Sequence, residues 1–333
     1  HGNHGVTSTC DKDETVEYTT LGRTALKVSV AGLGCGGSSR LGQNSGNSEA
    51  QAIALVRRAV DLGVNFFDTA EVYGTEAIVG LAVRDLPRDS VVISTKSRIR
   101  SAGRLVSGDD IIANLEASLQ RLQTEYVDVF HLHGVPPADY GHVRDEIVPA
   151  LMREQDKGKL RHLGITETGP NDPKHEMLQR AFDDDIFDVI MLAYHMMNQN
   201  ARQNVFPRSQ AQGIGTLLMF VVRRIFSDPV YLRGIMARLA QAGDIPQVLA
   251  DDDRPLDFLC GDGGASSVID AAYRFARHEP GADVILFGTG SLEHLEANID
   301  SILKPPLPEA DIETLYKLFG KLEGVGLDLP TQR

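Results

Sequence analysis

Short apolar runs alternate with longer amphipathic segments along the chain from about residue 16 onward. The apolar runs are rich in Val, Ile, Leu and Phe and end in glycine or polar residues, a pattern typical of buried strands. The segments between them repeat apolar residues at helical spacing, and the clearest one begins with Ser48 as an N-terminal cap and ends at Gly63. Eight strand–helix units are predicted, with strands at residues 27–36, 64–70, 91–97, 126–134, 161–167, 187–195, 213–220 and 283–290.

The alternation of strands and helices predicts a parallel sheet, because parallel strands need a long crossover between them. Eight such units favour a closed (β/α)8 TIM barrel of the α/β class over an open doubly wound sheet. The dinucleotide fingerprint of the open sheet, G-x-G-x-x-G, is absent after the first strand, where residues 32–37 read GLGCGG. We therefore expect a single barrel domain over residues 17–333, preceded at residues 1–16 by an extension that is disordered or an expression remnant.

Four chemically active side chains fall at or beside the carboxyl ends of three consecutive predicted strands. Asp68, Lys96 and His133 end these strands, and Tyr73 lies in the loop after Asp68. In a barrel these positions share one face, so an Asp68–Lys96 pair would compensate two costly buried charges. A lysine beside Tyr73 would favour the phenolate and lower the pKa of the phenol from about 10, which suits a general acid for a carbonyl oxygen. Taken singly, the same residues also fit a helix cap, a surface tyrosine, a surface lysine and a packed imidazole ring.

Composition restricts the function classes. The chain has 333 residues, with 33 Lys plus Arg against 46 Asp plus Glu, and a formal charge of −13. This acidity argues against unspecific binding to nucleic acid or anionic membranes, and no apolar run approaches the roughly 20 residues that span a bilayer. The cysteines, Cys10, Cys35 and Cys260, show neither metal-site spacing nor a disulfide framework, which indicates a reducing, cytoplasmic location.

Several motifs together resemble the aldo-keto reductase family across residues 17–303. They are EYTTLGRTALKVSVAGLGCG, GVNFFDTAEVYG, VVISTKS, YVDVFHLHG, GKLRHLGIT and GTGSLEHLEANI. The resemblance implies a (β/α)8 barrel that reduces aldehydes and ketones, or oxidises alcohols, with NADP(H) or NAD(H). It also implies a catalytic tetrad of Asp68, Tyr73, Lys96 and His133, in which the tyrosine protonates the carbonyl oxygen and the histidine orients it. His131 lies one layer deeper on the same strand face, and we interpret it as a hydrogen-bonded packing residue.

The resemblance also implies contacts to the nicotinamide, but several positions depart from the family's pattern. Thr166 and Glu167 stand where the family has Ser and Asn for the carboxamide, and Met191 replaces a Gln with the same role. Met219, with Phe220 one place on, stands where an aromatic ring normally stacks on the nicotinamide. The thioether of Met219 can still pack on the ring face.

The last strand–helix unit is implied to bind the phosphate and adenine end of the nucleotide, since backbone N–H groups at a helix start attract phosphate. His294 occupies the position of the family's Arg for the 2′-phosphate, and a neutral imidazole binds a dianion poorly compared with a guanidinium. We therefore expect a weakened preference for NADP(H), with NAD(H) as a second cofactor. The implied contacts in this unit and in the glycine-rich turn of the first strand are Gly36, Gly288, Thr289, Gly290, Ser291, His294 and Asn298.

Residues 223–265 form a predicted loop that is longer than a barrel connection requires. The segment carries helical patches and an acidic run at residues 251–253. A loop of this length at the active face is commonly a lid. The resemblance implies that this segment closes over the cofactor pyrophosphate, where Arg223 and Arg224 would meet it. Packing on the barrel rim is the alternative.

Two other functions stay open at this point. A cofactor-binding regulatory or sensor protein without turnover would fit the altered positions Glu167, Met191 and Met219. A metal-dependent barrel hydrolase would use His131 and His133 as ligands, although the other strand ends offer no convincing further ligand set. A small-molecule carbonyl or alcohol is the expected partner, and the sequence specifies neither its identity nor an oligomeric state.

Overall fold

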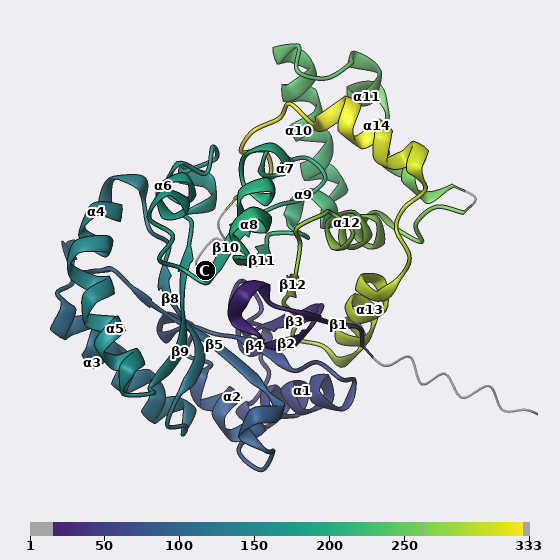
Figure 1. Cartoon of the computed structure of the whole chain (residues 1–333). Helices are drawn as coiled ribbons and strands as arrows, with labels where there is room; N and C mark the ends of the chain where they lie inside the picture. Colours follow the sequence, from purple (N-terminus) through teal and green to yellow (C-terminus); the bar gives the residue numbers. More distant parts are fainter. Residues whose placement is uncertain (1–15, 262, 329–333) are drawn as a thin grey trace, which may run out of the picture.

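The computed structural model describes residues 16–261 and 263–328. Parallel strands close into a barrel in the order β10-β11-β12-β3-β4-β5-β8-β9 (Figure 1). Neighbouring strands are parallel around the whole barrel, so the fold predicted from the sequence is confirmed. The barrel strands are β3 (Ala31–Gly34), β4 (Phe66–Asp68), β5 (Val92–Arg98), β8 (Val127–His133), β9 (Leu160–Thr166), β10 (Val189–Ala193), β11 (Gly215–Met219) and β12 (Val284–Phe287).

Helices connect successive strands and cover the outside of the barrel (Figure 1). Two of them begin with capping boxes, formed by Ser48 with Gln51 and by Ser107 with Asp110, which satisfy N–H groups of the first turn. The connecting helices are α1 (Glu49–Asp61), α2 (Glu76–Val83), α3 (Gly108–Leu122), α4 (Tyr140–His142), α5 (Val148–Asp156), α6 (Glu176–Asp184), α7 (Ala201–Asn204), α8 (Phe206–Gln212), α12 (Val268–Arg277) and α13 (Leu292–Leu303). A π-helical stretch, Val143–Ile147, joins α4 to α5, and the short strands β6 (Arg100–Ser101) and β7 (Arg104–Leu105) form a hairpin after β5.

The predicted first strand, residues 27–36, is two strands in the structure. β2 (Lys27–Ser29) pairs antiparallel with β1 (Tyr18–Thr20), and only β3 enters the barrel. Leu21 and Val28 of this hairpin are buried with the side chains of the barrel interior, so the hairpin closes the end of the barrel where the strands begin. Val16, predicted to belong to the extension, is 2% exposed and packs in the core. The expectation for residues 1–15 falls outside the described residues.

The segment predicted as a long loop at residues 223–265 is mostly helical. It contains α9 (Arg224–Ser227), α10 (Pro229–Ala242) and α11 (Gln247–Asp251). Leu232, Ile235 and Met236 of α10 are buried, so the segment is a packed excursion at the barrel rim. A further helix that the sequence interpretation omitted, α14 (Glu309–Phe319), appears near α10 and α11 in Figure 1.

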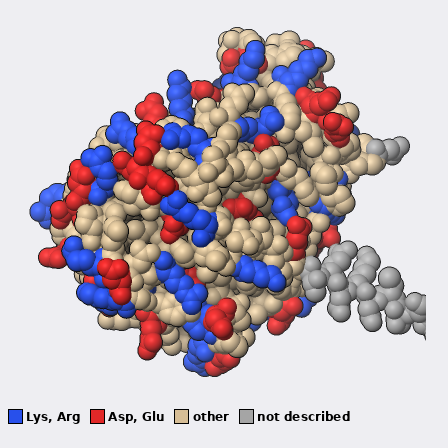
Figure 2. All heavy atoms as spheres, in the orientation of Figure 1, with Lys and Arg blue, Asp and Glu red and all other residues tan. Residues whose placement is uncertain are grey.

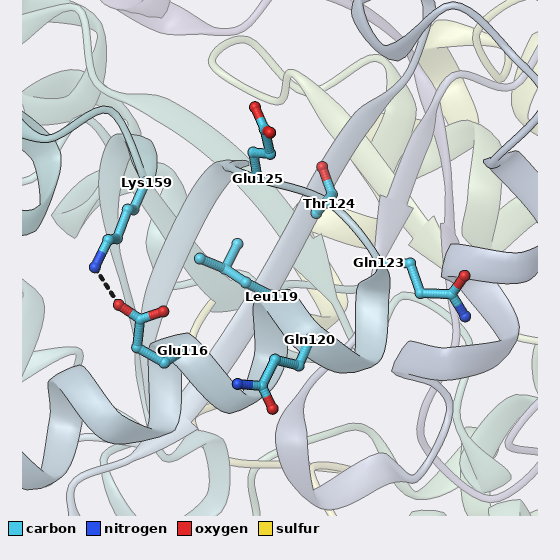
Figure 3. A pocket seen from close by; sticks show the side chains of 7 residues that line it. All are labelled: Glu116, Leu119, Gln120, Gln123, Thr124, Glu125 and Lys159. Atoms are coloured by element: carbon cyan, nitrogen blue, oxygen red, sulfur yellow. Dashed lines mark hydrogen bonds and ion pairs between the residues drawn. The ribbon is translucent and has the colours of Figure 1, made fainter.

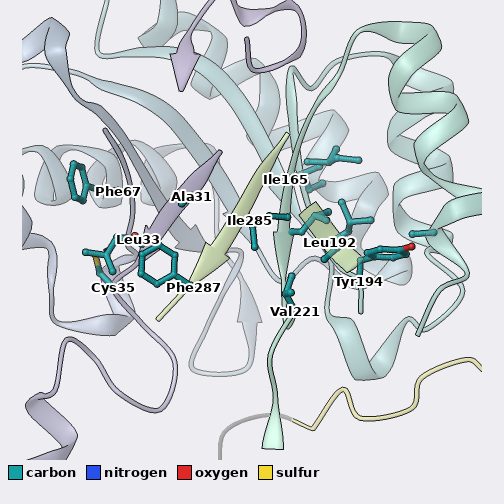
Figure 4. Packing of buried hydrophobic residues seen from close by; sticks show 14 of the residues in the cluster. Ala31, Leu33, Cys35, Phe67, Ile165, Leu192, Tyr194, Val221, Ile285 and Phe287 are labelled. Carbon is teal, nitrogen blue, oxygen red and sulfur yellow. Dashed lines mark hydrogen bonds between the residues drawn. The ribbon is translucent and has the colours of Figure 1, made fainter. Parts of the chain in front are cut away.

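Hydrophobic side chains form two separate cores. The larger one lies between the barrel and its helices and includes Leu33 and Phe67 (Figure 4). The smaller one fills the barrel interior with side chains such as Phe66 and Val129. Side chains alternate between the two faces of a strand. Phe66 points into the barrel and Phe67 points out of it, so Asp68 points into the barrel. The same alternation directs polar side chains at other strand ends into the mouth of the barrel.

Candidate active site

A buried ion pair lies at the carboxyl ends of β4 and β5. Nζ of Lys96 donates to Oδ2 of Asp68 at 2.6 Å and to the carbonyl oxygen of Thr69 at 2.7 Å. Oδ1 of Asp68 accepts a hydrogen bond from Ser94 at 2.9 Å, and Lys96 is fully buried. Burial alone would lower the pKa of Lys96, but the attraction of Asp68 outweighs it and the pKa is raised. The structure therefore contains the Asp68–Lys96 pair that the sequence predicts.

Tyr73 and His133 lie next to this pair. Nζ of Lys96 is 5.0 Å from the centroid of the Tyr73 ring, and the phenol oxygen is 3.5 Å from Nε2 of His133. The two rings meet edge to face, with an angle of 90° and centroids 5.7 Å apart. Burial, with a further contribution from Lys96, lowers the pKa of His133 to about 3, so its imidazole is neutral at physiological pH. The four residues predicted as a tetrad thus form one cluster at the barrel mouth.

The expected lowering of the Tyr73 pKa is wrong for this structure. Burial penalises the phenolate and raises the pKa of Tyr73, and the attraction of Lys96 is too weak to reverse the shift. The carboxylate of Asp68 adds to the increase, because it offsets the field of the lysine at the ring. Tyr73 is therefore held as a protonated phenol, which is the form that donates a proton.

Gly36, expected to contact the cofactor, lies directly against the ring of Tyr73. A Cβ atom at residue 36 would come within 2.4 Å of the Cε2 atom of that ring. Close packing of this kind leaves no space for a side chain. The glycine therefore has a packing role that the sequence did not reveal: it allows the Tyr73 ring to lie against the turn after β3.

We expect Gly36→Ala to lower kcat by about tenfold to a hundredfold, because the added methyl group displaces the ring of Tyr73 and small misplacements of a reacting group are costly. Gly141→Ala is the matched control, since a Cβ atom there meets no atom within 4 Å. Steady-state kinetics with a general aldehyde, together with thermal unfolding of both variants, measures the effect. An unchanged kcat in Gly36→Ala would show that the position of Tyr73 does not depend on this glycine.

His131 lies one layer below His133 inside the barrel. Its ring is fully buried, and neither nitrogen has a hydrogen-bond partner among the described residues, so the expected hydrogen bonding is wrong. Gly164 of β9 provides the space, because a Cβ atom there would come within 2.2 Å of Nδ1 of His131. Burial and the nearby Lys96 lower the pKa of His131 well below its ordinary value, so the ring packs in its neutral form.

The ends of β9 and β10 bring two predicted nicotinamide contacts together. Thr166 lies beside Met191 in the sheet register, and Met191 packs with the side chains of the barrel interior. The hydroxyl of Thr166 accepts a hydrogen bond at 2.7 Å from the N–H of Gly134, the residue that follows His133. Thr166 is thereby fixed next to the cluster that contains His133.

Glu167 does not present a free carboxylate. Its Oε1 accepts the backbone N–H of Ala193 at 2.8 Å, and its Oε2 lies 2.6 Å from Nδ1 of His175. The sequence interpretation missed His175. Glu167 itself could have indicated such a partner, because it is an acid where the family has an Asn. A buried carboxylate requires a compensating charge or hydrogen bonds.

Met219 is the last residue of β11 and Phe220 follows it, and their side chains lie in different places. Met219 packs against the interior core, whereas Phe220 has a left-handed φ of 65° and lies with its ring near Gly169 in the loop after β9. Arg223 stacks over the Phe220 ring at 4.4 Å, and its buried Nε has no hydrogen-bond partner among the described residues. This irregular strand end places a thioether, an aromatic ring and a cation at the rim.

The loop between β12 and α13 holds the predicted phosphate-binding residues. Ser291 caps α13 by accepting the N–H of His294 at 3.1 Å, and its own N–H donates to Thr289 at 3.1 Å. The loop after β3 is fastened here, because Asn47 donates to the carbonyl oxygen of Gly290 at 2.8 Å. The remaining predicted contacts in this unit are Gly288, which is exposed, and Asn298, which is half-buried.

The groups around the barrel mouth fit a nicotinamide dinucleotide. The start of α13 is suited to a phosphate because its N–H groups and dipole favour negative charge. The unpartnered Nε of Arg223 is a second, independent donor at the rim, and the buried hydroxyl of Thr168 is likewise without a partner among residues 16–261 and 263–328. Arg224, by contrast, is engaged with Asp228 at 3.0 Å.

Away from the barrel mouth, the described residues carry mixed surface charge (Figure 2) and surface hollows. Acidic and basic side chains are interspersed over the face shown in Figure 2. Within the described ranges, no group of three or more His, Cys, Asp or Glu side chains is placed to hold a metal ion, and no helix is both long and apolar enough to cross a membrane. A hollow beside the C-terminal end of α3 lies at the opposite end of the barrel from the tetrad (Figure 3). It is lined by Glu116, Leu119, Gln120, Gln123, Thr124, Glu125 and Lys159.

Comparisons with known proteins agree with this architecture. The model of the Aldo/keto reductase family matches residues 32–319. L-galactose dehydrogenase of Arabidopsis thaliana is 27% identical, over 93% of this chain and 95% of that protein. Aldo-keto reductase YhdN of Bacillus subtilis is 28% identical, over 85% of this chain and 87% of that protein. The holo form of aldo-keto reductase AKR11C1 from Bacillus halodurans superposes with a TM-score of 0.70 at 23% identity and covers 91% of this chain and 96% of that one.

The chain belongs to the aldo-keto reductase family, since the family model covers most of its length. Membership implies the oxidoreduction of carbonyl compounds with a nicotinamide cofactor. It replaces the interpretation of the His131 and His133 pair as ligands of a metal-dependent hydrolase.

Proposed function

We propose that this protein is an NAD(P)-dependent oxidoreductase that interconverts an aldehyde or ketone and the corresponding alcohol, with Tyr73 as its general acid and base. The observation that carries the proposal is the cluster at the barrel mouth. A protonated phenol lies beside a buried Asp68–Lys96 ion pair, and its oxygen is 3.5 Å from a neutral imidazole, that of His133.

In this proposal Tyr73 donates its phenolic proton to the carbonyl oxygen as negative charge develops there. The N–H of the neutral His133 ring binds and orients that oxygen, and the charge of Lys96 stabilises the phenolate that remains. Asp68 holds Lys96 in place through the 2.6 Å contact. The hydride is supplied by the reduced nicotinamide. In the direction of oxidation the same residues act in reverse, and the Tyr73 phenolate accepts the proton of the alcohol.

We propose that the nicotinamide lies over the ends of β9, β10 and β11. Thr166 would bind the carboxamide with its hydroxyl, and Met191 and Met219 would line the ring with apolar surface. Glu167 borders this subsite. Arg223, which stacks on Phe220 at the rim, would hold the pyrophosphate together with residues 288–291, and His294 and Asn298 would hold the adenosine end. Arg224 is a weaker candidate, because Asp228 already compensates its charge.

The affinities for NADPH and NADH should differ by no more than about one to two decades, or about 1.4–2.8 kcal/mol. His294 is exposed and Gly288 contributes no side chain, so the 2′-phosphate lacks a bidentate guanidinium partner at these positions. His294→Arg should shift the ratio toward NADPH and leave NADH affinity unchanged. Fluorescence titration of both nucleotides measures this. A thousandfold preference for NADPH in the unaltered protein would contradict this prediction. Arg223 would then be the next candidate to bind the 2′-phosphate.

A sugar is the second candidate substrate class. The similarity to L-galactose dehydrogenase extends over 93% of the chain, which favours testing the oxidation of a sugar hydroxyl beside the reduction of aldehydes. Turnover of nitrobenzaldehyde with NADPH and of aldoses with NAD⁺ tests the proposed function. Binding of both nucleotides without any turnover would favour the regulatory or sensor role instead.

The cytoplasmic location inferred from the cysteines stays a prediction.

A further inference from the structure

A buried pair of an acid and an imidazole lies beside the strand ends assigned to the nicotinamide. Oε2 of Glu167 is 2.6 Å from Nδ1 of His175, and Nε2 of His175 is 3.0 Å from Oδ1 of Asn200. The other oxygen of Glu167 accepts the N–H of Ala193, the last residue of β10, at 2.8 Å. Glu167 is 3% exposed and His175 is 1% exposed, so the pair is sealed from solvent.

The hydrogen bonds of His175 fit a ring that carries two protons beside an ionised Glu167. Nδ1 faces a carboxylate, and Nε2 faces the amide oxygen of Asn200, whose nitrogen donates to the carbonyl oxygen of Pro173. With Glu167 ionised, both partners are acceptors and both ring nitrogens donate, so the ring is an imidazolium. Burial alone would lower the pKa of His175, but Glu167, Asn200 and Asp172 together outweigh burial and the pKa is raised.

The carboxylate is the end of the pair that lies beside the strand ends. The N–H of Glu167 donates to the carbonyl oxygen of Met191 at 3.2 Å, and the preceding residue, Thr166, is hydrogen-bonded to the turn that follows His133. His175, the residue before α6, lies against Oε2 and is in turn bonded to Asn200. The Oε1 side of the carboxylate therefore faces the end of β10, and the imidazole ring bonds to the other oxygen.

We propose that the Glu167–His175 pair biases the nicotinamide site toward the oxidised cofactor, and so toward oxidation of an alcohol or sugar. This inference rests on the function proposed above. The oxidised nicotinamide ring carries a positive charge and the reduced ring carries none, so a nearby carboxylate attracts the oxidised form selectively. His175 makes the burial of that carboxylate tolerable. The imidazolium bonds to Oε2, whereas Oε1 faces the N–H of Ala193 at the end of β10, so it weakens the attraction at the strand ends without cancelling it.

Glu167→Gln tests the role of the charge, because it keeps the shape of the side chain and an acceptor for the N–H of Ala193. We expect the ratio of the Kd of the oxidised nucleotide to the Kd of the reduced one to rise about tenfold, which corresponds to about 1.4 kcal/mol. Isothermal titration calorimetry with NAD⁺ and NADH, and with NADP⁺ and NADPH, measures both constants. Glu167→Asp keeps the charge and should keep the ratio of the unaltered protein, even where both affinities fall.

Glu279→Gln is the matched control for the loss of a buried carboxylate. Glu279 is 7% exposed and is bonded to Tyr194 at 2.6 Å and to Arg202 at 3.0 Å, away from the barrel mouth. Its replacement should lower stability without changing the ratio of the two affinities. Glu167→Asn provides a second neutral variant in case Glu167→Gln does not fold.

The outcomes separate this inference from the proposed function. An unchanged ratio in a folded neutral variant, or an equal loss of affinity for both forms, would overturn the inference and assign the pair a structural role. The proposed function would stand in that case. Failure of the unaltered protein to bind either form would instead contradict the proposed function itself.

Discussion

Replacing Tyr73 with phenylalanine should lower the rate of carbonyl reduction by roughly 10²–10⁴-fold and leave cofactor affinity nearly unchanged. The substitution removes only the phenolic O–H, whose oxygen lies 3.5 Å from Nε2 of His133. Burial raises the pKa of this phenol, so at neutral pH the proton that is lost in the variant is the one available for transfer. Single-turnover kinetics under saturating cofactor isolates the chemical step from binding and product release.

Tyr18→Phe is the control for the loss of a phenolic hydroxyl. The hydroxyl of Tyr18 donates to the carbonyl oxygen of Gly63 at 2.6 Å, in the hairpin at the opposite end of the barrel. This variant should turn over at the rate of the unaltered protein. Near-normal turnover in Tyr73→Phe as well would remove Tyr73 from the mechanism, whereas loss of cofactor binding would assign it a packing role.

Lys96→Met should abolish activity and lower the free energy of unfolding by on the order of 3–5 kcal/mol. Lys96 is fully buried and is bonded to Asp68 at 2.6 Å, so the substitution leaves an uncompensated carboxylate in the interior. The hydrogen bond to the carbonyl oxygen of Thr69 is lost as well. Chemical denaturation measures the change in stability, and steady-state kinetics measures the loss of activity.

The double variant Asp68→Asn/Lys96→Met tests whether the lost stability comes from the stranded charge. It should regain part of the stability lost in Lys96→Met and stay inactive, because the buried carboxylate is gone but the tetrad is still broken. Lys317→Met is the surface control, since Lys317 of α14 is exposed and exposed charges contribute little to stability. If Lys96→Met had an unchanged denaturation midpoint and full activity, the pairing would have no role in either property.

The cluster of Asp68, Tyr73, Lys96 and His133 could be predicted because it depends on strand order and alternation. Asp68, Lys96 and His133 each end a strongly apolar strand, and in a closed parallel barrel such residues must meet at one end. The pKa of Tyr73 could not be predicted in the same way. The direction of its pKa shift depends on how deeply the Tyr73 ring is buried against Gly36. The spacing of residues in the sequence does not reveal that depth.

Other features depend on contacts that local patterns do not specify. His175 reaches Glu167 because a left-handed turn, with a φ of 58° at residue 175, directs its ring back toward the strand ends. The strand predicted at residues 27–36 joins β2 to β3, since Val30 continues the apolar alternation across the break. By contrast, the apolar spacing of Leu232, Ile235 and Met236 was a readable helical signal within the segment predicted as a loop.

The order of strands around the barrel has a consequence for how the chain folds during synthesis. β3 pairs with β12, so Ala31 must meet Ile285 before the barrel can close. Until β12 has left the ribosome, a nascent chain keeps two open sheet edges, one at β3 and one at β11. Open edges of this kind recruit other strands and promote aggregation. The protein therefore depends on the last barrel strand to be synthesised for protection of the first.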